Sequence, residues 1–220
     1  MKVLIVAKTR MNKDRVCVGG LAWEKYLPKK GEVKSVRLID TNESIAELFR
    51  LEFEIGDVLI VKGVKKIKVT PPHVEDYEVH QTEFSASMDN PIKFIEQHMP
   101  SKHGGKEVLF RGMTRTTQEG ALYISKRTGV PDFSTMFWRP NQQLSLKTIK
   151  GTKRYVYGDA KTKAMFTLAY VGLPEPVESI PANTLVRVSL ARWWRPDSQP
   201  DMEKRCYVQL SGWIQRNKGG

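Results

Sequence analysis

One short segment of the chain places arginine and tryptophan side by side, Arg192-Trp193-Trp194-Arg195-Pro196. Guanidinium groups pair with phosphates, and a surface tryptophan can stack on a nucleic-acid base for roughly 1–3 kcal/mol per base. Successive residues of a strand face opposite ways, so at a strand end one tryptophan would enter the core while the other stands on the surface. The segment predicts a base-stacking site with Arg192, Trp193 and Arg195 as contacts, or equally a core tryptophan beside one that packs on a neighbouring domain.

The stretch from Arg205 to Ile214 has the alternation of a strand with two different faces. Cys206, Val208 and Leu210 would form its inward face. The other face carries a cation, aromatic rings and hydrogen-bonding groups, on Arg205, Tyr207, Gln209, Ser211 and Trp213. That face would suit a nucleic-acid groove, a protein interface or packing against another domain. We take Arg205, Tyr207 and Trp213 as candidate nucleic-acid contacts.

A third basic and aromatic segment is Lys153-Arg154-Tyr155-Val156-Tyr157. In a strand, Lys153, Tyr155 and Tyr157 share one face. A hairpin with these side chains could wrap a single strand of nucleic acid, so all three are candidate contacts. An exposed hairpin without any ligand is the alternative.

All four histidines lie between positions 73 and 103, and the first two stand among acidic residues. The group consists of His73, Glu75, Asp76, His80 and Glu83. Metal-dependent hydrolysis needs carboxylates and imidazoles that converge on one cation. Three ligands do not fall on any single strand face here, so we predict a polar loop that leaves the first domain, without a metal site.

The sequence contains none of the short motifs that mark common catalytic sites. It has no GxxxxGK[ST] or GxGxxG phosphate loop and no GxSxG nucleophile elbow. Its two cysteines, Cys17 and Cys206, are far apart and form no CxxC pair. We therefore expect a protein without cofactor and without catalytic residues, although dispersed carboxylates can also assemble a nuclease.

The positive charge is concentrated in the second half of the chain. The formal net charge is +12, from 36 Lys and Arg against 24 Asp and Glu. Residues 111–220 contribute 18 basic and 8 acidic side chains, or +10, which leaves +2 for residues 1–110. A basic domain of this kind indicates a polyanion such as nucleic acid, an acidic protein partner, or only a well-solvated surface.

Short strand patterns dominate the sequence, and they predict a mainly β protein. Five candidate strands follow residue 143, at 144–149, 153–157, 164–173, 184–194 and 205–214, with Gly- and Pro-rich turns between them. Five short strands in so few residues favour a small OB-type barrel. The first half has a comparable series, at 2–8, 16–21, 32–39, 58–61, 65–69 and 77–84.

We therefore predict two OB-like small β-barrels in tandem, with short helices between strands. One helix or turn is expected over 44–53, and a helix over 90–97, capped by Asp89 or Asn90 with Pro91 in its first turn. The break after it predicts a first barrel over 1–100 and a second, basic barrel over 141–220. Residues 101–140 form a connecting segment whose assignment the sequence leaves open. Within it, 108–110 could be a strand, and 120–126 a short strand or helix.

No apolar run approaches the roughly 18 residues that a membrane span needs. The opening Val3-Leu4-Ile5-Val6 run is too short for the core of a signal peptide. We expect a protein that is not membrane-bound and that stays in the cytoplasm.

Several of these segments resemble the prokaryotic dual OB-fold domain proteins. They are Lys8 to Arg15, Cys17-Val18-Gly19-Gly20, Pro71-Pro72-His73-Val74-Glu75-Asp76 and the ending Arg205 to Trp213. The resemblance spans nearly the whole chain and implies two OB-like barrels in one compact unit. It also implies nucleic-acid or nucleotide recognition, often within multi-gene bacterial conflict systems.

The chain departs from this family at one position. The family has a tryptophan followed by an Arg-Pro step after the cysteine, whereas this chain has Trp23-Glu24-Lys25-Tyr26-Leu27-Pro28. A role at that position is therefore not carried over, and the resemblance names no catalytic residue.

These observations predict a nucleic-acid-binding module rather than an enzyme, with single-stranded DNA or RNA preferred because aromatic side chains reach unstacked bases. The candidate contacts are Lys153, Tyr155, Tyr157, Arg192, Trp193, Arg195, Arg205, Tyr207 and Trp213. One alternative is an adaptor or nucleotide-signal sensor in a larger complex, docked to an acidic protein. Another is a metal-dependent nuclease centred on His73 to Glu83.

Overall fold

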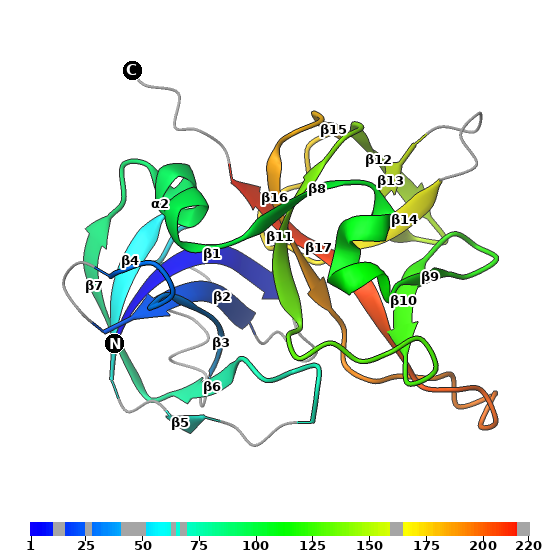
Figure 1. Ribbon diagram of the computed structural model, residues 1–220, viewed down its shortest axis with the longest axis horizontal. Coiled ribbons are helices and arrows are strands. Elements are labelled where there is room, and N and C mark those ends of the chain that lie inside the picture. Colours follow the sequence, from blue (N-terminus) through cyan, green and yellow to red (C-terminus); the bar gives the residue numbers. More distant parts are fainter. Residues whose placement is uncertain are drawn as a thin grey trace.

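The protein folds almost entirely into strands, which form two sheets placed side by side (Figure 1). The computed structural model describes residues 1–10, 16–24, 28–40, 52–62, 65–66, 70–158 and 165–214. The helical elements of this part are α2 (Pro91–His98) and the 3₁₀ segment η1 (Lys106–Gly112). The prediction of a mainly β protein is confirmed. Within the described residues, no helix is long and apolar enough to span a membrane.

The first sheet is a barrel closed by a bent strand. Its strands are β1 (Lys2–Arg10), β2 (Val16–Trp23), β3 (Lys34–Asp40), β4 (Asp57–Lys62), β5 (Lys65–Lys66), β6 (Asp76–Val79) and β7 (Gln81–Ser87). β1, β2 and β3 are antiparallel neighbours, and β4 pairs with the free side of β1. β6 runs parallel to β3, while β7, which follows after His80 alone, is antiparallel to β4. The stretch from β6 to β7 therefore joins the two edges of the sheet.

The second sheet repeats this connectivity. Its main strands are β11 (Thr135–Pro140), β12 (Leu144–Ile149), β13 (Thr152–Tyr157), β14 (Phe166–Tyr170), β16 (Leu185–Leu190) and β17 (Arg205–Ile214). β12, β13 and β14 are antiparallel neighbours, and β17 runs parallel to β14. β16 lies between β17 and β11, and β11 is continued by β12 three residues later. Both sheets thus follow one five-strand order, which confirms two OB-like barrels in tandem although the sequence shows no internal repeat.

Part of the segment that the sequence left unassigned adds strands to the second sheet. β8 (Ser101–Gly104) runs parallel to β11, and β10 (Leu122–Ser125) pairs with both β17 and the short β9 (Arg115–Thr116). β15 (Ser179–Ile180) pairs with the outer edge of β12. The strand considered for 108–110 is wrong, because these residues belong to η1, where Phe110 has a φ of +47°.

The helix expected near residue 90 is confirmed in α2. The Asn90 side chain accepts a hydrogen bond from the Lys93 amide at 2.9 Å, and Pro91 occupies the first turn. The helix or turn expected over 44–53 and the strand end at 67–69 fall largely outside the described residues.

An apolar cluster shared by both halves fuses the two barrels into one body. Leu4, Val6 and Leu21 of the first sheet pack in one cluster with Leu185 and Ile214 of the second. Main-chain hydrogen bonds add to it, from the Arg10 amide to the Val171 carbonyl at 2.9 Å and from the Leu173 amide to the Lys8 carbonyl at 2.8 Å. The packing between the halves, which the sequence left undetermined, is therefore both apolar and hydrogen-bonded.

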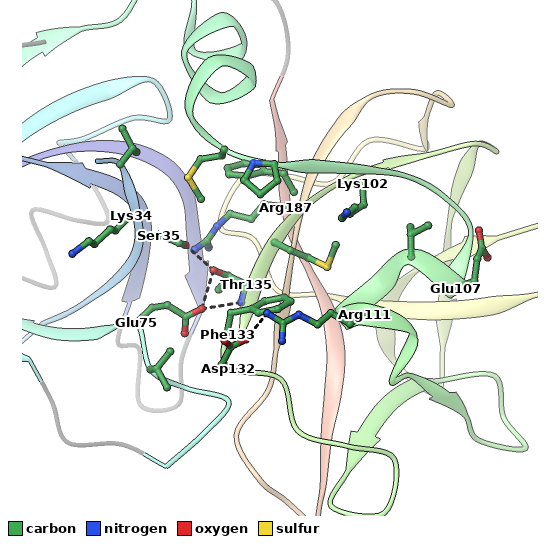
Figure 2. Close-up of a pocket in the computed structure, with 17 residues that line it drawn as sticks. Lys34, Ser35, Glu75, Lys102, Glu107, Arg111, Asp132, Phe133, Thr135 and Arg187 are labelled. Atoms are coloured by element: carbon green, nitrogen blue, oxygen red, sulfur yellow. Dashed lines mark hydrogen bonds and ion pairs between the residues drawn. The ribbon is translucent and has the colours of Figure 1, made fainter. Parts of the chain in front are cut away.

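This packing leaves a cavity of about 700 Å³ between the halves (Figure 2). Lys34, Ser35 and Glu75 line it from the first half of the chain. Phe133 and Arg187 line it from the second.

Candidate nucleic-acid interface

The arginine–tryptophan segment lies just beyond the end of a strand rather than within it. β16 ends at Leu190, and the chain then turns so that Trp194 and Arg205 exchange main-chain hydrogen bonds of 2.9 and 2.8 Å. Trp193 is half-buried, and its indole nitrogen donates to the Pro71 carbonyl at 3.0 Å. Trp194 is 53% exposed. The surface tryptophan is therefore Trp194, whereas Trp193 contacts the first half of the chain.

Arg192 takes part in the contact between the halves. Its guanidinium group forms an ion pair with Asp76, which also accepts a hydrogen bond from Arg37 at 2.7 Å. Asp76 is fully buried. Burial alone would raise the pKa of its carboxyl group, but the hydrogen bonds and charges of Arg37 and Arg192 outweigh burial and lower it. Arg192 thus neutralises a buried carboxylate.

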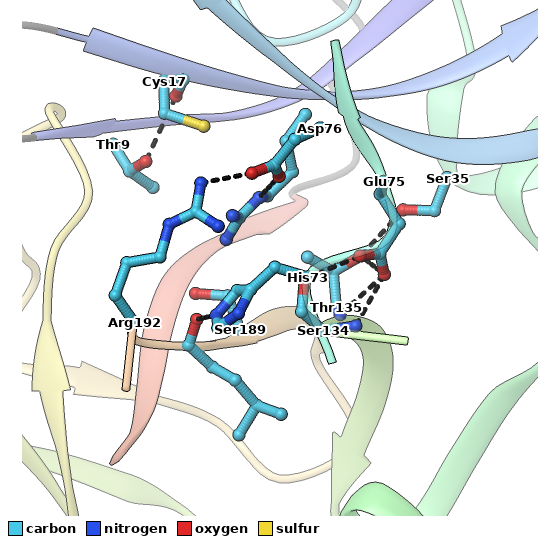
Figure 3. A network of polar contacts seen from close by, with 12 residues as sticks. Thr9, Cys17, Ser35, His73, Glu75, Asp76, Ser134, Thr135, Ser189 and Arg192 are labelled. Atoms are coloured by element: carbon cyan, nitrogen blue, oxygen red, sulfur yellow. Dashed lines mark hydrogen bonds and ion pairs between the residues drawn. The ribbon is translucent and has the colours of Figure 1, made fainter. Parts of the chain in front are cut away.

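Glu75 and His73 add further contacts between the two halves. Together with Asp76, Arg37 and Arg192 they form what we call the boundary network (Figure 3). Glu75 accepts hydrogen bonds from the amide and hydroxyl of Ser134 at 2.6 and 2.7 Å and from the Thr135 amide at 3.2 Å. The Nε2 atom of His73 faces the carbonyl of Ala191 at 3.0 Å, so this nitrogen carries the proton and donates. Burial, followed by the nearby charges of two arginines, lowers the pKa of His73 to about 4.

The boundary network explains the histidine and carboxylate cluster that the sequence singled out. His73, Glu75 and Asp76 are buried and turn their polar atoms to the facing barrel, while His80 and Glu83 are exposed on the β6–β7 stretch. Over the described ranges, no three His, Cys, Asp or Glu side chains are grouped so as to hold a metal ion. The cluster therefore holds the two halves together.

Several predicted contacts lie inside the second barrel. Tyr155 and Tyr157 are 0% and 3% exposed, and the Tyr155 hydroxyl donates to the Val177 carbonyl at 2.8 Å. Burial raises the pKa of Tyr155 to about 12. Trp213 is half-buried beside Tyr155 at 6.2 Å between ring centroids. Tyr155 and Tyr157 are not placed to stack on a base, because the face of β13 that they share is the inner face of the barrel wall. Trp213 packs against this core from β17, beside Tyr155 and Tyr170.

Lys153 remains at the surface, where it pairs with Glu175 at 3.0 Å. It lies at the start of β13, so its side chain reaches solvent although it alternates in phase with two core tyrosines. Its charge is matched by an acidic neighbour, which makes it a weak candidate for phosphate.

Tyr123, Trp194, Arg205 and Tyr207 form a continuous surface across β10, β17 and the turn after β16, which we call the aromatic patch. Tyr123 and Tyr207 are directly opposite on paired strands, with ring centroids 6.2 Å apart. Tyr207 also lies 6.1 Å from Trp194, and the Arg205 guanidinium sits 4.2 Å from the centre of the Tyr123 ring. The patch therefore offers aromatic faces together with a cation held by stacking.

A pocket of about 440 Å³ adjoins the aromatic patch and carries an excess of positive charge. It is lined by Thr70, Lys126, Trp193, Arg195, Glu203 and Lys204, and we call it the basic pocket. Lys126 follows β10 directly and Lys204 precedes β17 directly, so the basic pocket adjoins the strands that carry the aromatic patch. None of Lys126, Arg195 and Lys204 forms an ion pair with another residue of the described ranges. Glu203 approaches Arg127 and Arg205 at 3.7 and 3.8 Å.

The structure thus brings together part of the predicted set and adds members that the sequence analysis did not choose. Arg195, Arg205 and Tyr207 lie at the patch or pocket, and Trp193 lines the pocket. Tyr123, Lys126 and Lys204 were missed. Treating 120–126 as a strand with Leu122 and Ile124 inward would have turned Tyr123 outward.

The fold and this surface define a two-barrel β protein with one basic, aromatic face. The chain belongs to the family described as the dual OB-containing domain, whose sequence model matches residues 1–213. No curated protein matches the sequence. Among solved structures, the chain is similar to the Ifi202 HINa domain, crystallised in complex with a 20-base-pair double-stranded DNA. The identity is 8%, the TM-score 0.39, and the match covers 98% of this chain and 96% of that one.

Proposed function

We propose that the protein is a nucleic-acid-binding module that takes single-stranded DNA or RNA on the aromatic patch and the basic pocket. The observation that carries this proposal is the exposure of Trp194 beside Tyr207. Trp194 lies in the chain between Trp193 and Arg195, which both line the basic pocket. An exposed tryptophan among other aromatic rings and cations offers a face on which a base can stack.

Each part of this surface has a separate task in the proposal. Trp194 and Tyr123 stack on bases, which favours single strands because their bases are free to leave a helical stack. Lys126, Arg195 and Lys204 contact phosphates, while Arg205 is fixed over Tyr123 and adds charge to the stacking face. Phosphate contacts supply most of the affinity of such complexes, and each contact releases counterions.

The charge distribution supports the same surface. The +10 of residues 111–220 includes every cation of the patch and the pocket, whereas residues 1–110 carry only +2. A basic face raises the local concentration of a polyanion and accelerates its association.

The test is a fluorescence-anisotropy titration of nuclease-treated protein with labelled single-stranded DNA, single-stranded RNA and duplex DNA at about 50 and 200 mM salt. We expect salt-sensitive binding that favours single strands. Trp194→Ala should weaken it by about 1–3 kcal/mol, or roughly 5- to 150-fold, since one stacked base is lost.

Phe84→Ala is the matched control. Phe84 is also a large exposed aromatic residue, 52% exposed against 53% for Trp194, but it lies on β7 of the first barrel. Its loss should leave binding unchanged. Equal losses in both variants, or equal affinity at the two salt concentrations, would refute the proposed surface. No binding at low salt would also refute the proposal and would leave docking of an acidic protein as the alternative to test.

A further inference from the structure

The cavity between the two halves plays no part in the proposed nucleic-acid surface. Its volume of about 700 Å³ lies within the range of pockets that hold small molecules, about 300–1,000 Å³. Much of its wall is apolar, formed by Val33, Val74, Met99, Val108, Phe133 and Phe137. Both halves of the chain contribute to it, and pockets of this kind are common between domains.

Arg187 is an unusual member of this wall because it is a buried charge without a direct ion pair among the described residues, although the charge of Glu75 acts on it from farther away. It lies on β16 and is 2% exposed. Its Nη2 atom has no hydrogen-bond partner, and the guanidinium forms no ion pair, among the residues that the structure describes. Burial lowers the pKa of Arg187 to about 10, so the group still carries its charge at pH 7. Burying an uncompensated charge destabilises a fold by several kcal/mol, on the order of 3–5.

Gly19 on β2 makes room for this arginine. A Cβ atom at position 19 would lie 1.9 Å from the Arg187 Nη1 atom and 2.4 Å from its central guanidinium carbon. The guanidinium therefore lies close against Gly19 of the first barrel, at a point where a larger residue would displace it. This close approach fixes the charge at the boundary.

The acidic groups of the cavity are already engaged. Glu75 accepts from Ser134 and Thr135, Asp132 pairs with Arg111 at 2.9 Å, and Glu107 accepts from the Gly105 amide at 2.6 Å.

Among the described cations of the cavity, only Arg111 is paired with a lining carboxylate, that of Asp132. Two further cations, Lys34 and Lys102, line it and form no ion pair within the described ranges. Figure 2 shows Lys34 on the side of the first barrel and Lys102 on the side of the second, with Arg187 between them in this view. The polar groups left free in the cavity are therefore positively charged.

We propose that the cavity binds a small organic phosphate, with the phosphate on Arg187 and the ring on the apolar wall beside Phe133, while Lys34 and Lys102 add positive charge around the phosphate. A phosphate monoester supplies up to two negative charges and three acceptor oxygens, which suits the fork of donors on a guanidinium group. A ring-bearing ester also buries apolar surface against the wall, which inorganic phosphate does not.

Isothermal titration calorimetry of the full chain tests this site. The probes are AMP and 1-naphthyl phosphate, with inorganic phosphate, adenosine and 1-naphthol as their separate parts. We expect each aromatic phosphate to bind more tightly than either part. An oligonucleotide with and without a 5′-phosphate completes the series, because a strand end offers the same head group. A gain from the 5′-phosphate that depends on Arg187 would identify the strand end as a source, and its absence would identify free esters as the source.

Arg187→Met is the decisive variant. We expect it to weaken binding of AMP at least tenfold and to leave folding intact, because an apolar side chain of similar length in place of a buried charge is often neutral or stabilising. Gly19→Ala keeps the Arg187 guanidinium but displaces it, and should weaken the binding of AMP as well. Lys102→Ala should reduce the affinity for AMP several-fold. Lys147 is an exposed cation on β12, and Lys147→Ala should leave the affinity for AMP unchanged.

Two results would overturn the proposal. One is the absence of binding by both aromatic phosphates at about 1 mM. The other is unchanged AMP affinity in folded Arg187→Met or in Gly19→Ala. Binding of an unphosphorylated oligonucleotide to the aromatic patch should be the same in wild type and Arg187→Met, so failure here is distinguishable from failure of the nucleic-acid surface.

Discussion

The boundary network and the basic pocket each contain an arginine of one short segment, Arg192 and Arg195, and the two regions have different roles. In the boundary network, Arg37 and Arg192 neutralise Asp76, whose side chain is fully buried. In the basic pocket, Arg195 lines an open space and forms no ion pair with any other described residue. The comparison teaches that residue type does not decide whether a charge stabilises the fold or is available to a ligand. The decisive difference is whether the charged group is already paired with a buried carboxylate of the protein.

The energetic consequence of that difference is large. A buried ion pair that loses one member leaves a charge in a low-dielectric surrounding, which water cannot screen. A surface charge that is lost changes the free energy of unfolding by no more than about 1 kcal/mol. Variants of the boundary network should therefore change stability, and variants of the basic pocket should change binding.

Asp76→Ala should have the largest effect. It leaves the guanidinium group of Arg37, whose side chain is 11% exposed, without its carboxylate partner, and it also removes the partner of Arg192. We expect the free energy of unfolding to fall by about 3–5 kcal/mol, measured by urea denaturation. Asp76→Asn, which keeps an acceptor oxygen, should lose less and provides a folded variant if the alanine form does not fold.

Glu83→Ala is the matched control for this prediction. Glu83 forms an exposed ion pair with Lys62 at 3.7 Å, so its removal should change stability by less than about 1 kcal/mol. Equal effects of the Asp76 and Glu83 variants would contradict a structural role for the boundary network.

His73 should make stability depend on pH. Its pKa is lowered to about 4 in the folded protein, against about 6.5 in an unfolded chain, so the unfolded state binds the proton more readily. The stabilisation is fully present above pH 6.5 and is lost as the pH falls from about 6.5 towards 4. A difference of this size corresponds to about 3 kcal/mol.

The measurement is the urea midpoint at several pH values for wild type and His73→Gln. The glutamine amide can donate to the Ala191 carbonyl as Nε2 does, but it does not titrate. The variant should therefore show a flatter profile between pH 6.5 and 4. Superimposable profiles would mean that another group causes the pH dependence.

Much of the fold was predictable from local pattern. The strand at 205–214 was placed with its observed limits, and its inward residues Cys206, Val208 and Leu210 are all buried. The cap and first turn of α2 were also predicted, since Asn90 and Pro91 act within a few residues. Division of the chain at residues 100 and 141 stays a prediction.

The site was less predictable, because burial depends on residues that are distant in sequence. Alternation put Tyr155 and Tyr157 on one face but did not say that this face is the interior. His73 and Asp76 looked like potential ligands because their partners, Ala191 and Arg192, come more than 110 residues later. A local pattern shows which side chains share a face but not what covers that face.

Arg192 and Arg195 provide the finest test of the comparison, since they are three positions apart and carry the same charge. Arg192→Ala should reduce the free energy of unfolding by about 1.5 kcal/mol, the low end for a hydrogen bond to a charged group, because Arg37 still serves Asp76. Its effect on nucleic-acid affinity should be small.

Arg195→Ala should show the reverse behaviour, with unchanged stability and a slope of log K against log salt that is smaller by about 0.7, as expected for one phosphate contact to a single strand. Urea denaturation and anisotropy titrations of both variants at several salt concentrations measure the two quantities side by side. If both variants lost stability, or both lost the same salt slope, the two arginines would have one role and the distinction between boundary network and basic pocket would be wrong. If Arg192→Ala lost only stability and Arg195→Ala lost only salt-dependent affinity, a structural arginine and a ligand-binding arginine would lie three positions apart.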